Sequence, residues 1–119
     1  MLLFEAALLM LFIKHWLCDF VWQTQPMMRD KGTYGAKYGV LHSVYHGLGT
    51  FAVFAVSGMV FALFLAIIDF VFHYHIDWAK MKYGNKDNAT SRYWAEFGLD
   101  QLAHSATYLI IVAIFVRSV

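Results

Sequence analysis

The stretch FAVFAVSGMVFALFLAIIDFVF, residues 51–72, decides the fold because Asp69 is its one charged side chain. A membrane-spanning α-helix needs about 20 predominantly apolar residues. This stretch belongs to a longer apolar run, residues 40–79, that exceeds one bilayer crossing. Ser57 and Gly58 interrupt the run near its middle, and a glycine favours a turn. We therefore predict two membrane spans joined by a tight hairpin at Ser57-Gly58.

Composition places the whole chain among integral membrane proteins. It is 61% hydrophobic and 14% charged, whereas soluble domains contain roughly 25% charged residues. A soluble helical bundle is the less favoured alternative, because most of the expected helices lack a polar face. The formal net charge of +1 gives no reason to expect nucleic-acid binding. The single cysteine, Cys18, excludes an internal disulfide and a thiolate zinc cluster within one chain.

The apolar stretches predict an all-α fold, a four-helix transmembrane bundle in a single domain of residues 1–119. The expected spans are residues 2–23, 40–56, 59–79 and 94–116. The first of these is expected to be retained, because no basic segment precedes it as in a secretory signal. Both long connectors are rich in Lys and Arg, and such loops stay in the cytoplasm. We therefore predict a multi-pass protein of the inner (cytoplasmic) membrane with both termini on the non-cytoplasmic side.

Histidine and aspartate recur along the expected helices in four pairs, each with a spacing of four residues. Residues four apart share one face of a helix. Because successive helices run in opposite directions, pairs late in one helix and early in the next lie at a similar depth, near the cytoplasmic end. The sequence therefore predicts one shared site, formed by His15 with Asp19, His42 with His46, His73 with Asp77, and Asp100 with His104.

These residues indicate a divalent metal ion. An ionisable side chain inside a membrane span costs about 2.5 to 3.5 kcal/mol on insertion scales, and a cation bound by carboxylates and imidazoles offsets that cost. The mixture of ligands favours Zn²⁺, with Mn²⁺ or Fe²⁺ as alternatives, over Ca²⁺. Eight residues exceed the four positions of a tetrahedral site, so one or two ions are expected. We predict the metal ligands His15, His42, His46, His73, Asp77 and His104.

Other polar residues near the pairs receive supporting roles. Asp19 and Asp100 are the predicted catalytic residues, as additional ligands or as the general base. Gln23, Gln101 and Asp69 are predicted to orient the ligands by hydrogen bonds. Asp69 has an alternative role, in a buried ion pair with Lys14. Lys31 and Lys80 are predicted to bind a phosphate or anionic lipid headgroup, although flanking lysines more often only anchor helix ends.

The motifs resemble those of domain-of-unknown-function family 3307, small multi-pass membrane proteins of bacteria and their phages. The resemblance covers nearly the whole chain. No established activity accompanies it, and Lys14 and His75 are polar additions to the usual pattern. The matching motifs are HWLCDFVWQ (15–23), Lys31, LHSVYH (41–46), HYHIDWAK (73–80) and DQLAH (100–104). The resemblance implies that the four pairs, Gln23, Gln101, Lys31 and Lys80 occupy motif positions.

Three functions fit these features. The favoured one is a metal-dependent hydrolase that acts on a phosphorylated or lipid substrate at the cytoplasmic leaflet. The first alternative is a proton, ion or small-solute transport protein that uses the His/Asp cluster as a relay. The second is a non-catalytic module in which the metal only holds the helices together. In each case the expected partners are membrane lipids, and assembly into a homo-oligomer is an additional possibility.

Overall fold

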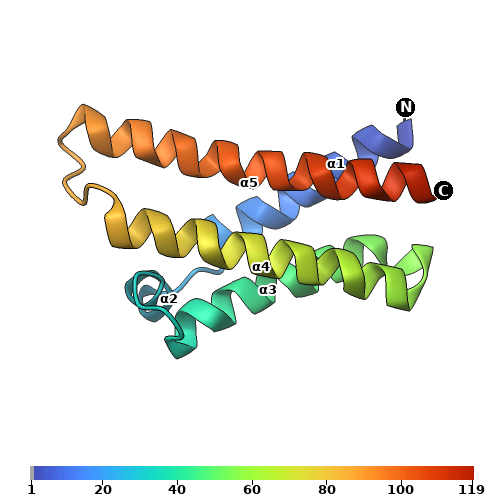
Figure 1. Ribbon diagram of the computed structural model, residues 1–119, viewed down its shortest axis with the longest axis horizontal. Helices are drawn as coiled ribbons and strands as arrows, with labels where there is room; N and C mark the ends of the chain where they lie inside the picture. The colour runs from blue at the N-terminus through green and yellow to red at the C-terminus, as the bar shows by residue number, and fades with distance from the viewer. Residues whose placement is uncertain (1) are drawn as a thin grey trace.

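The computed structural model describes residues 2–119, and within them the fold is all-α, as predicted. Residue 1, which the predicted domain includes, lies outside the described part. Five α-helices are present there, four of them long (Figure 1). In chain order the elements are α1 (Leu2–Trp16), a π-helical turn (Leu17–Val21), α2 (Gln25–Asp30), α3 (Lys37–Phe54), a short 3-10 turn (Ala55–Ser57), α4 (Met59–Tyr83) and α5 (Ser91–Ser118).

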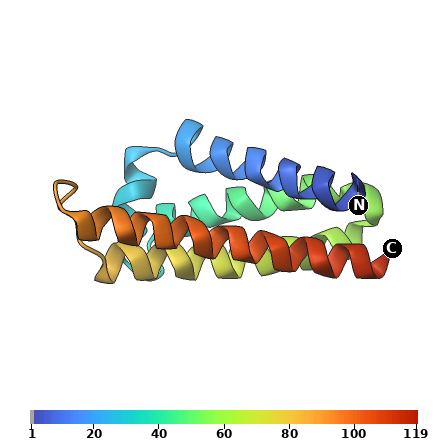
Figure 2. The same cartoon turned by 90° about the horizontal axis from the view of Figure 1, so that it is seen from above.

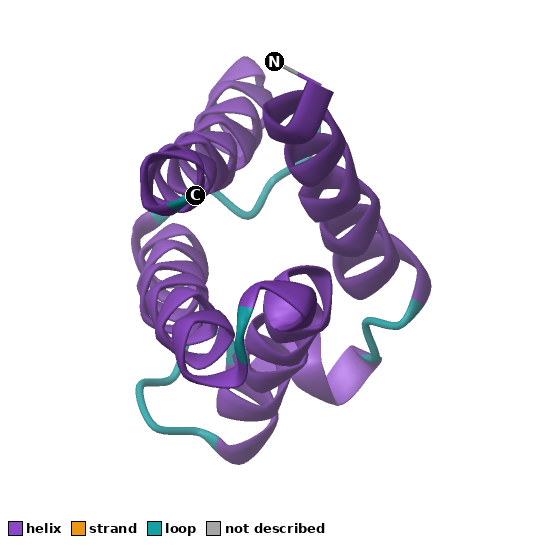
Figure 3. Ribbon diagram, turned by 90° about the vertical axis from the view of Figure 1, so that its right-hand side faces the viewer, coloured by secondary structure: helices purple, strands orange, loops and turns teal. Residues whose placement is uncertain are grey.

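The four long helices run along the longest axis of a body that measures 45 × 29 × 21 Å. The end of the chain, the start of α1 and the α3–α4 hairpin lie at one end of this body, and α2 and the α4–α5 connector lie at the other (Figures 1 and 2). Seen from the hairpin end, the helices surround a common interior (Figure 3). This arrangement matches the alternating helix directions expected from the sequence.

The predicted hairpin at Ser57-Gly58 is confirmed. Gly58 has a φ of 113°, a conformation that residues with a Cβ rarely adopt. The short 3-10 turn ends at Ser57, and α4 begins directly afterwards at Met59. The apolar run of residues 40–79 is therefore two helices packed side by side, so that the beginning of α3 and the end of α4 lie at the same end of the bundle.

Three helical segments, Lys37–Ser57, α4 and α5, are long and apolar enough to cross a membrane. Their outward faces carry large exposed apolar side chains such as Leu63, Ile67 and Leu102. Such faces are suited to contact with lipid chains. The α1 helix has 15 residues and continues through the π-helical turn, so the predicted span 2–23 covers two elements. The short helix α2 was not predicted; Thr24 caps its first turn by accepting a hydrogen bond from Met27 N.

The interior of the bundle has two chemically different halves. Near the hairpin, the buried side chains form an apolar core that α1, α3, α4 and α5 share. Toward the α2 end, the same helices bury ionisable side chains instead. The apolar core consists of Ala7, Leu11, Phe54, Ala62, Leu65, Tyr108, Ile111, Val112 and Phe115.

Candidate metal centre

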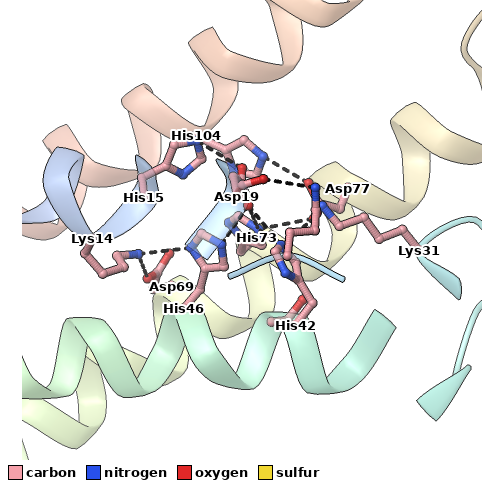
Figure 4. Close-up of polar contacts among 12 residues, drawn as sticks. Lys14, His15, Asp19, Lys31, His42, His46, Asp69, His73, Asp77 and His104 are labelled. Atoms are coloured by element: carbon pink, nitrogen blue, oxygen red, sulfur yellow. Dashed lines mark hydrogen bonds and ion pairs between the residues drawn. The ribbon is translucent and has the colours of Figure 1, made fainter. Parts of the chain in front are cut away.

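All four predicted pairs meet in the polar half of the bundle (Figure 4), which Asp100 joins through its contact with His104. The end of α1 with its π-helical turn, the middle of α3, the second half of α4 and the first half of α5 each contribute two residues. Their side chains are almost completely removed from solvent. The buried members are His15, Asp19, His42, His46, His73, Asp77, Asp100 and His104.

Asp19 occupies the centre of this cluster and lies in the π-helical turn Leu17–Val21. A backbone hydrogen bond from Trp22 N to Leu17 O, 2.8 Å long, closes the wider turn. Single π-helical turns within α-helices frequently occur at functional sites, because they redirect a side chain. The turn therefore gives Asp19 a different direction from the one a regular α-helix would give it.

Four histidines face the Asp19 carboxylate, one from α1, two from α3 and one from α4. Oδ1 lies 2.9 Å from His42 Nε2 and 2.8 Å from His46 Nε2. His73 Nε2 is 3.7 Å from the same oxygen, and His15 Nε2 is 3.1 Å from Oδ2. Within the described chain, the nitrogen partners of the Asp19 carboxylate are all imidazoles.

His42, His73 and Asp77 form a second group of close contacts directly beside Asp19. The two Nε2 atoms of His42 and His73 are 3.3 Å apart. Asp77 Oδ2 lies 3.2 Å from His73 Nε2 and 3.5 Å from His42 Nε2. The Nδ1 atoms of both histidines are buried and have no hydrogen-bond partner among the described residues. Two imidazole nitrogens this close share one proton or one cation.

His46 differs from His42 because a lysine faces its other ring nitrogen. Lys14 Nζ is 3.3 Å from His46 Nδ1, and an ammonium group only donates. His46 Nδ1 therefore accepts, and in the neutral ring the proton lies on Nε2, which donates to Asp19 Oδ1. The ring of His46 also stacks on His73, with centroids 3.4 Å apart and planes inclined by 20°.

His15 is held by hydrogen bonds at both ring nitrogens. Its Nδ1 is 2.8 Å from the Tyr108 hydroxyl, and its Nε2 is 3.1 Å from Gln101 Oε1. With Asp19 Oδ2 also near Nε2, both positions of the ring are occupied. These contacts keep the His15 ring beside the Asp19 carboxylate.

His104 and Asp100 lie on the α5 side of the cluster. His104 Nε2 is 3.1 Å from Asp77 Oδ1 and 3.5 Å from Asp100 Oδ1. The other oxygen of Asp100, Oδ2, accepts from Gln101 Nε2 at 3.0 Å and from Lys80 Nζ at 3.3 Å. His104 thus bridges two carboxylates, one in the middle of the cluster and one at its edge.

Lysines pair with three of the four buried carboxylates. Lys14 Nζ is 2.6 Å from Asp69 Oδ2, which confirms the predicted ion pair and leaves Asp69 beside the cluster. Lys31 Nζ lies 2.9 Å from Asp77 Oδ2, and Lys80 pairs with Asp100. Asp19 is the fourth carboxylate.

Three overlapping groups of side chains could hold a metal ion, each with its ligand atoms within 4.8 Å of one another. They share His73 and His104, so they form one continuous set of ligands. Ligand atoms about 2.0 to 2.2 Å from a tetrahedral zinc lie about 3.3 Å apart, and the contacts around Asp19 scatter about this value. The groups are Asp19 with His42, His46 and His73; His15 with His73 and His104; and Asp77 with Asp100 and His104.

A pocket of about 490 Å³ opens beside the cluster at the α2 end. Asp19 and Asp77 line its inner part, and Lys31, Lys80 and Lys86 lie around it. His42 and His73 are almost fully buried behind these carboxylates. Two carboxylates of the cluster and three basic side chains therefore line one cavity, whose volume is in the range of small-molecule sites.

The remaining predicted residues also contact the cluster. Gln23 Nε2 donates to the backbone oxygen of Asp19 at 3.0 Å. Two residues were missed in the sequence: the Thr50 hydroxyl donates to Asp69, and Tyr108 contacts His15 and Lys14. Each continues the spacing of four residues, after His46 and after His104 respectively, which is the signal that could have found them.

The chain belongs to a family described as a protein of unknown function (DUF3307), whose model matches residues 7–119. This match confirms the resemblance seen in the motifs. Searches of curated proteins and of solved structures found no match. The site must therefore be interpreted from its own geometry.

Proposed function

We propose that this protein is a membrane metal-dependent hydrolase that cleaves phosphate esters at the cytoplasmic surface. The carrying observation is Asp19, a buried carboxylate that faces imidazoles, has no lysine among its described partners, and lines the pocket. A buried carboxylate without a compensating cation is costly. A divalent ion beside it removes that cost and places a Lewis acid at the inner wall of a cavity with basic side chains.

The proposed ligands are Asp19, His42 and His73, because a zinc ion that activates water needs one of its four positions free. They lie in the π-helical turn, α3 and α4, and the distances between their ligand atoms are 2.9, 3.3 and 3.7 Å. Asp77 is left to Lys31, whose Nζ lies 2.9 Å from Asp77 Oδ2. His46 is assigned a different role, because Lys14 faces its Nδ1 and its ring is nearly parallel to that of His73. Parallel stacked rings direct their in-plane lone pairs alongside each other, not toward one ion. His46 and His15 instead position Asp19.

Charge supports a single divalent ion. Lys14, Lys31 and Lys80 compensate Asp69, Asp77 and Asp100. With neutral histidines, the cluster then retains one negative charge, that of Asp19. A second divalent ion beside Asp100 would have to share this carboxylate with Lys80. Zinc suits two imidazoles and one carboxylate.

In this proposal Lys31, Lys80 and Lys86 bind the phosphate of the substrate in the pocket, as charge-assisted donors. A zinc ion held by Asp19, His42 and His73 would keep one coordination position for a water and would supply a Lewis acid beside the pocket. In the proposed hydrolysis a water oxygen would form a bond to phosphorus, and the bond between phosphorus and the ester oxygen would break. One proton of the water would pass to the His104–Asp100 pair, and the released alcohol would take a proton from solvent.

The relay alternative has less support from the packing. Beyond Lys14 and Asp69 the interior continues as the apolar core, with Leu11, Leu65 and Ile111 fully buried. A transport pathway through one chain would have to cross this core. The module without catalysis is tested by the same measurements as the enzyme.

Elemental analysis of the protein purified without chelator tests the metal site. We expect about one zinc per chain in the wild type and less than about a tenth of this in His42→Gln and His73→Gln. His75→Gln is the matched control, because His75 is exposed on α4, two residues from His73. Absence of a transition metal from folded wild type would contradict the proposal.

Hydrolysis of 4-nitrophenyl phosphate tests the reaction. Metal-loaded wild type should release phosphate, chelation should abolish release, and zinc should restore it. Protein that binds zinc but releases no phosphate from any ester would favour the module without catalysis. Metal-free protein that conducts protons in proteoliposomes would favour the relay.

A further inference from the structure

A lateral groove between α4 and α5 adjoins the polar pocket on the outer surface of the bundle. It has a volume of about 490 Å³ and is formed by the end of α4 and the beginning of α5. Ile76 and Ala79 contribute its α4 wall, and Leu99 and Ala103 its α5 wall. Both helices are long and apolar enough to cross a membrane, and a membrane crossed by them would place lipid beside this groove.

The groove and the pocket share side chains. Lys80 and Glu96 line both cavities. Asp100, which accepts from Lys80, lines the groove, whereas Asp19 and Asp77 line the pocket. A molecule that occupies both cavities would therefore extend from apolar walls, past Lys80, to the carboxylates of the metal centre.

The two cavities together have an apolar part and a basic part, as an amphiphilic molecule has an apolar chain and a charged headgroup. Leu99 is 64% exposed although it lies on the wall of a groove, so an acyl chain could cover it. Toward the connector, the groove carries Arg92, and the adjoining pocket carries Lys31 and Lys86. Basic groups at the level of the headgroups attract anionic lipids. Farther from the connector, the apolar walls of the groove replace the contacts that the acyl chain makes with other lipid chains in the bilayer.

We propose that the substrate is a membrane lipid with a terminal phosphate, whose acyl chain lies in the α4–α5 groove while its phosphate reaches the pocket. Hydrolysis of this lipid rests on the proposed function, whereas its binding in the groove does not. The lipid reaches the metal centre sideways from the membrane, because the groove opens along the helices. Lys80, at the junction of the two cavities, contacts the phosphate and sets its depth.

Two substrates with the same phosphate group test the proposal: phosphatidic acid in phosphatidylcholine vesicles and water-soluble glycerol 3-phosphate. The variant Leu99→Trp fills the groove. Leu102→Trp is its matched control, since Leu102 lies on the same helix, is 63% exposed and does not line the groove. We expect Leu99→Trp to lower kcat/KM for phosphatidic acid about tenfold and to leave glycerol 3-phosphate hydrolysis within twofold. Leu102→Trp should leave both within twofold.

Photolabelling with a phosphatidic acid that carries a diazirine in its acyl chain measures binding without catalysis. We expect labelled peptides from residues 76–83 and 99–103, and at least a fivefold decrease in Leu99→Trp alone. Label in the groove without phosphate release from either substrate would refute the proposed hydrolase and support the lipid site. Phosphate release without label in the groove, equal losses in both variants, or crosslinks from Leu99 to a second copy of the chain would overturn the lipid site.

Discussion

Around the α3–α4 hairpin the four long helices bury leucine, isoleucine and phenylalanine, whereas at the α2 end the same helices bury histidine, aspartate and lysine. On α4 the change occurs within two turns, from Leu65 to Asp69. The apolar half is stabilised by close packing, which depends on shape and volume. The polar half depends on defined partners, because each buried charge requires an opposite charge or a cation. The two halves should therefore respond differently to single substitutions.

The largest expected effect is the loss of the proposed zinc ion on substitution of Asp19. Asp19→Asn removes the negative charge that faces His42 and His46, and we expect zinc content to fall at least tenfold. Asp87→Asn, in the exposed α4–α5 connector, is the control and should retain the metal. Elemental analysis with circular dichroism separates loss of the ion from loss of the fold. Full zinc content in folded Asp19→Asn would refute the central role of this carboxylate.

The ion pair at the boundary between the halves gives the next largest effect. Lys14→Met leaves Asp69 buried without a cation, and we expect a loss of about 3 to 5 kcal/mol in the free energy of unfolding. The double variant Lys14→Met with Asp69→Leu should recover most of this loss, because it removes both charges. Chemical unfolding in detergent measures both. A double variant no more stable than Lys14→Met would show that Lys14 does not stabilise the fold through its ion pair with Asp69.

Packing governs the apolar half. Leu65 is fully buried among α1, α3 and α5, so Leu65→Ala should cost about 2 to 5 kcal/mol by loss of contacts and creation of a cavity. Zinc content should stay unchanged, in contrast to Asp19→Asn. Leu63→Ala, on the exposed face of α4, is the control. A coupled loss of metal would show that the halves are not independent.

The smallest effect concerns Asp30, outside the spans. A hydrogen bond from Arg29 Nε, 2.8 Å long, lowers the pKa of Asp30, burial opposes this, and the Tyr38 backbone N–H adds to it at 3.1 Å. Since the folded pKa is depressed, this stabilisation is present above the unfolded value of about 3.9 and is lost as the pH falls through the folded value.

Hydrogen exchange at the start of α3 measures this contribution. Asp30→Asn should open the first turn of α3 a few times more often near neutral pH, whereas wild type should approach the variant only in acid. Metal content should not change at neutral pH in either protein. Equal protection of Tyr38 in both proteins at neutral pH would show that Asp30 does not stabilise the helix start.

Local patterns were enough to predict much of this protein. Ser57-Gly58 indicated the hairpin because an uninterrupted apolar run of that length cannot cross once. The four pairs indicated a shared cluster because alternating helices return to the same depth. The short helix α2 was missed, since six residues with a proline give little periodic signal. The π-helical turn at Asp19 was missed as well, because its sequence resembles any apolar helix.

Sequence by itself determined the all-α class, the hairpin and the convergence of histidine with aspartate, because spacing and hydropathy act within single helices. Only tertiary structure decided how the members of the cluster differ. Lys14 reaches His46 from another helix, the His46 ring stacks on His73, and Asp19 and Asp77 face the pocket. These differences arise from contacts between residues distant in sequence, which helical periodicity does not encode.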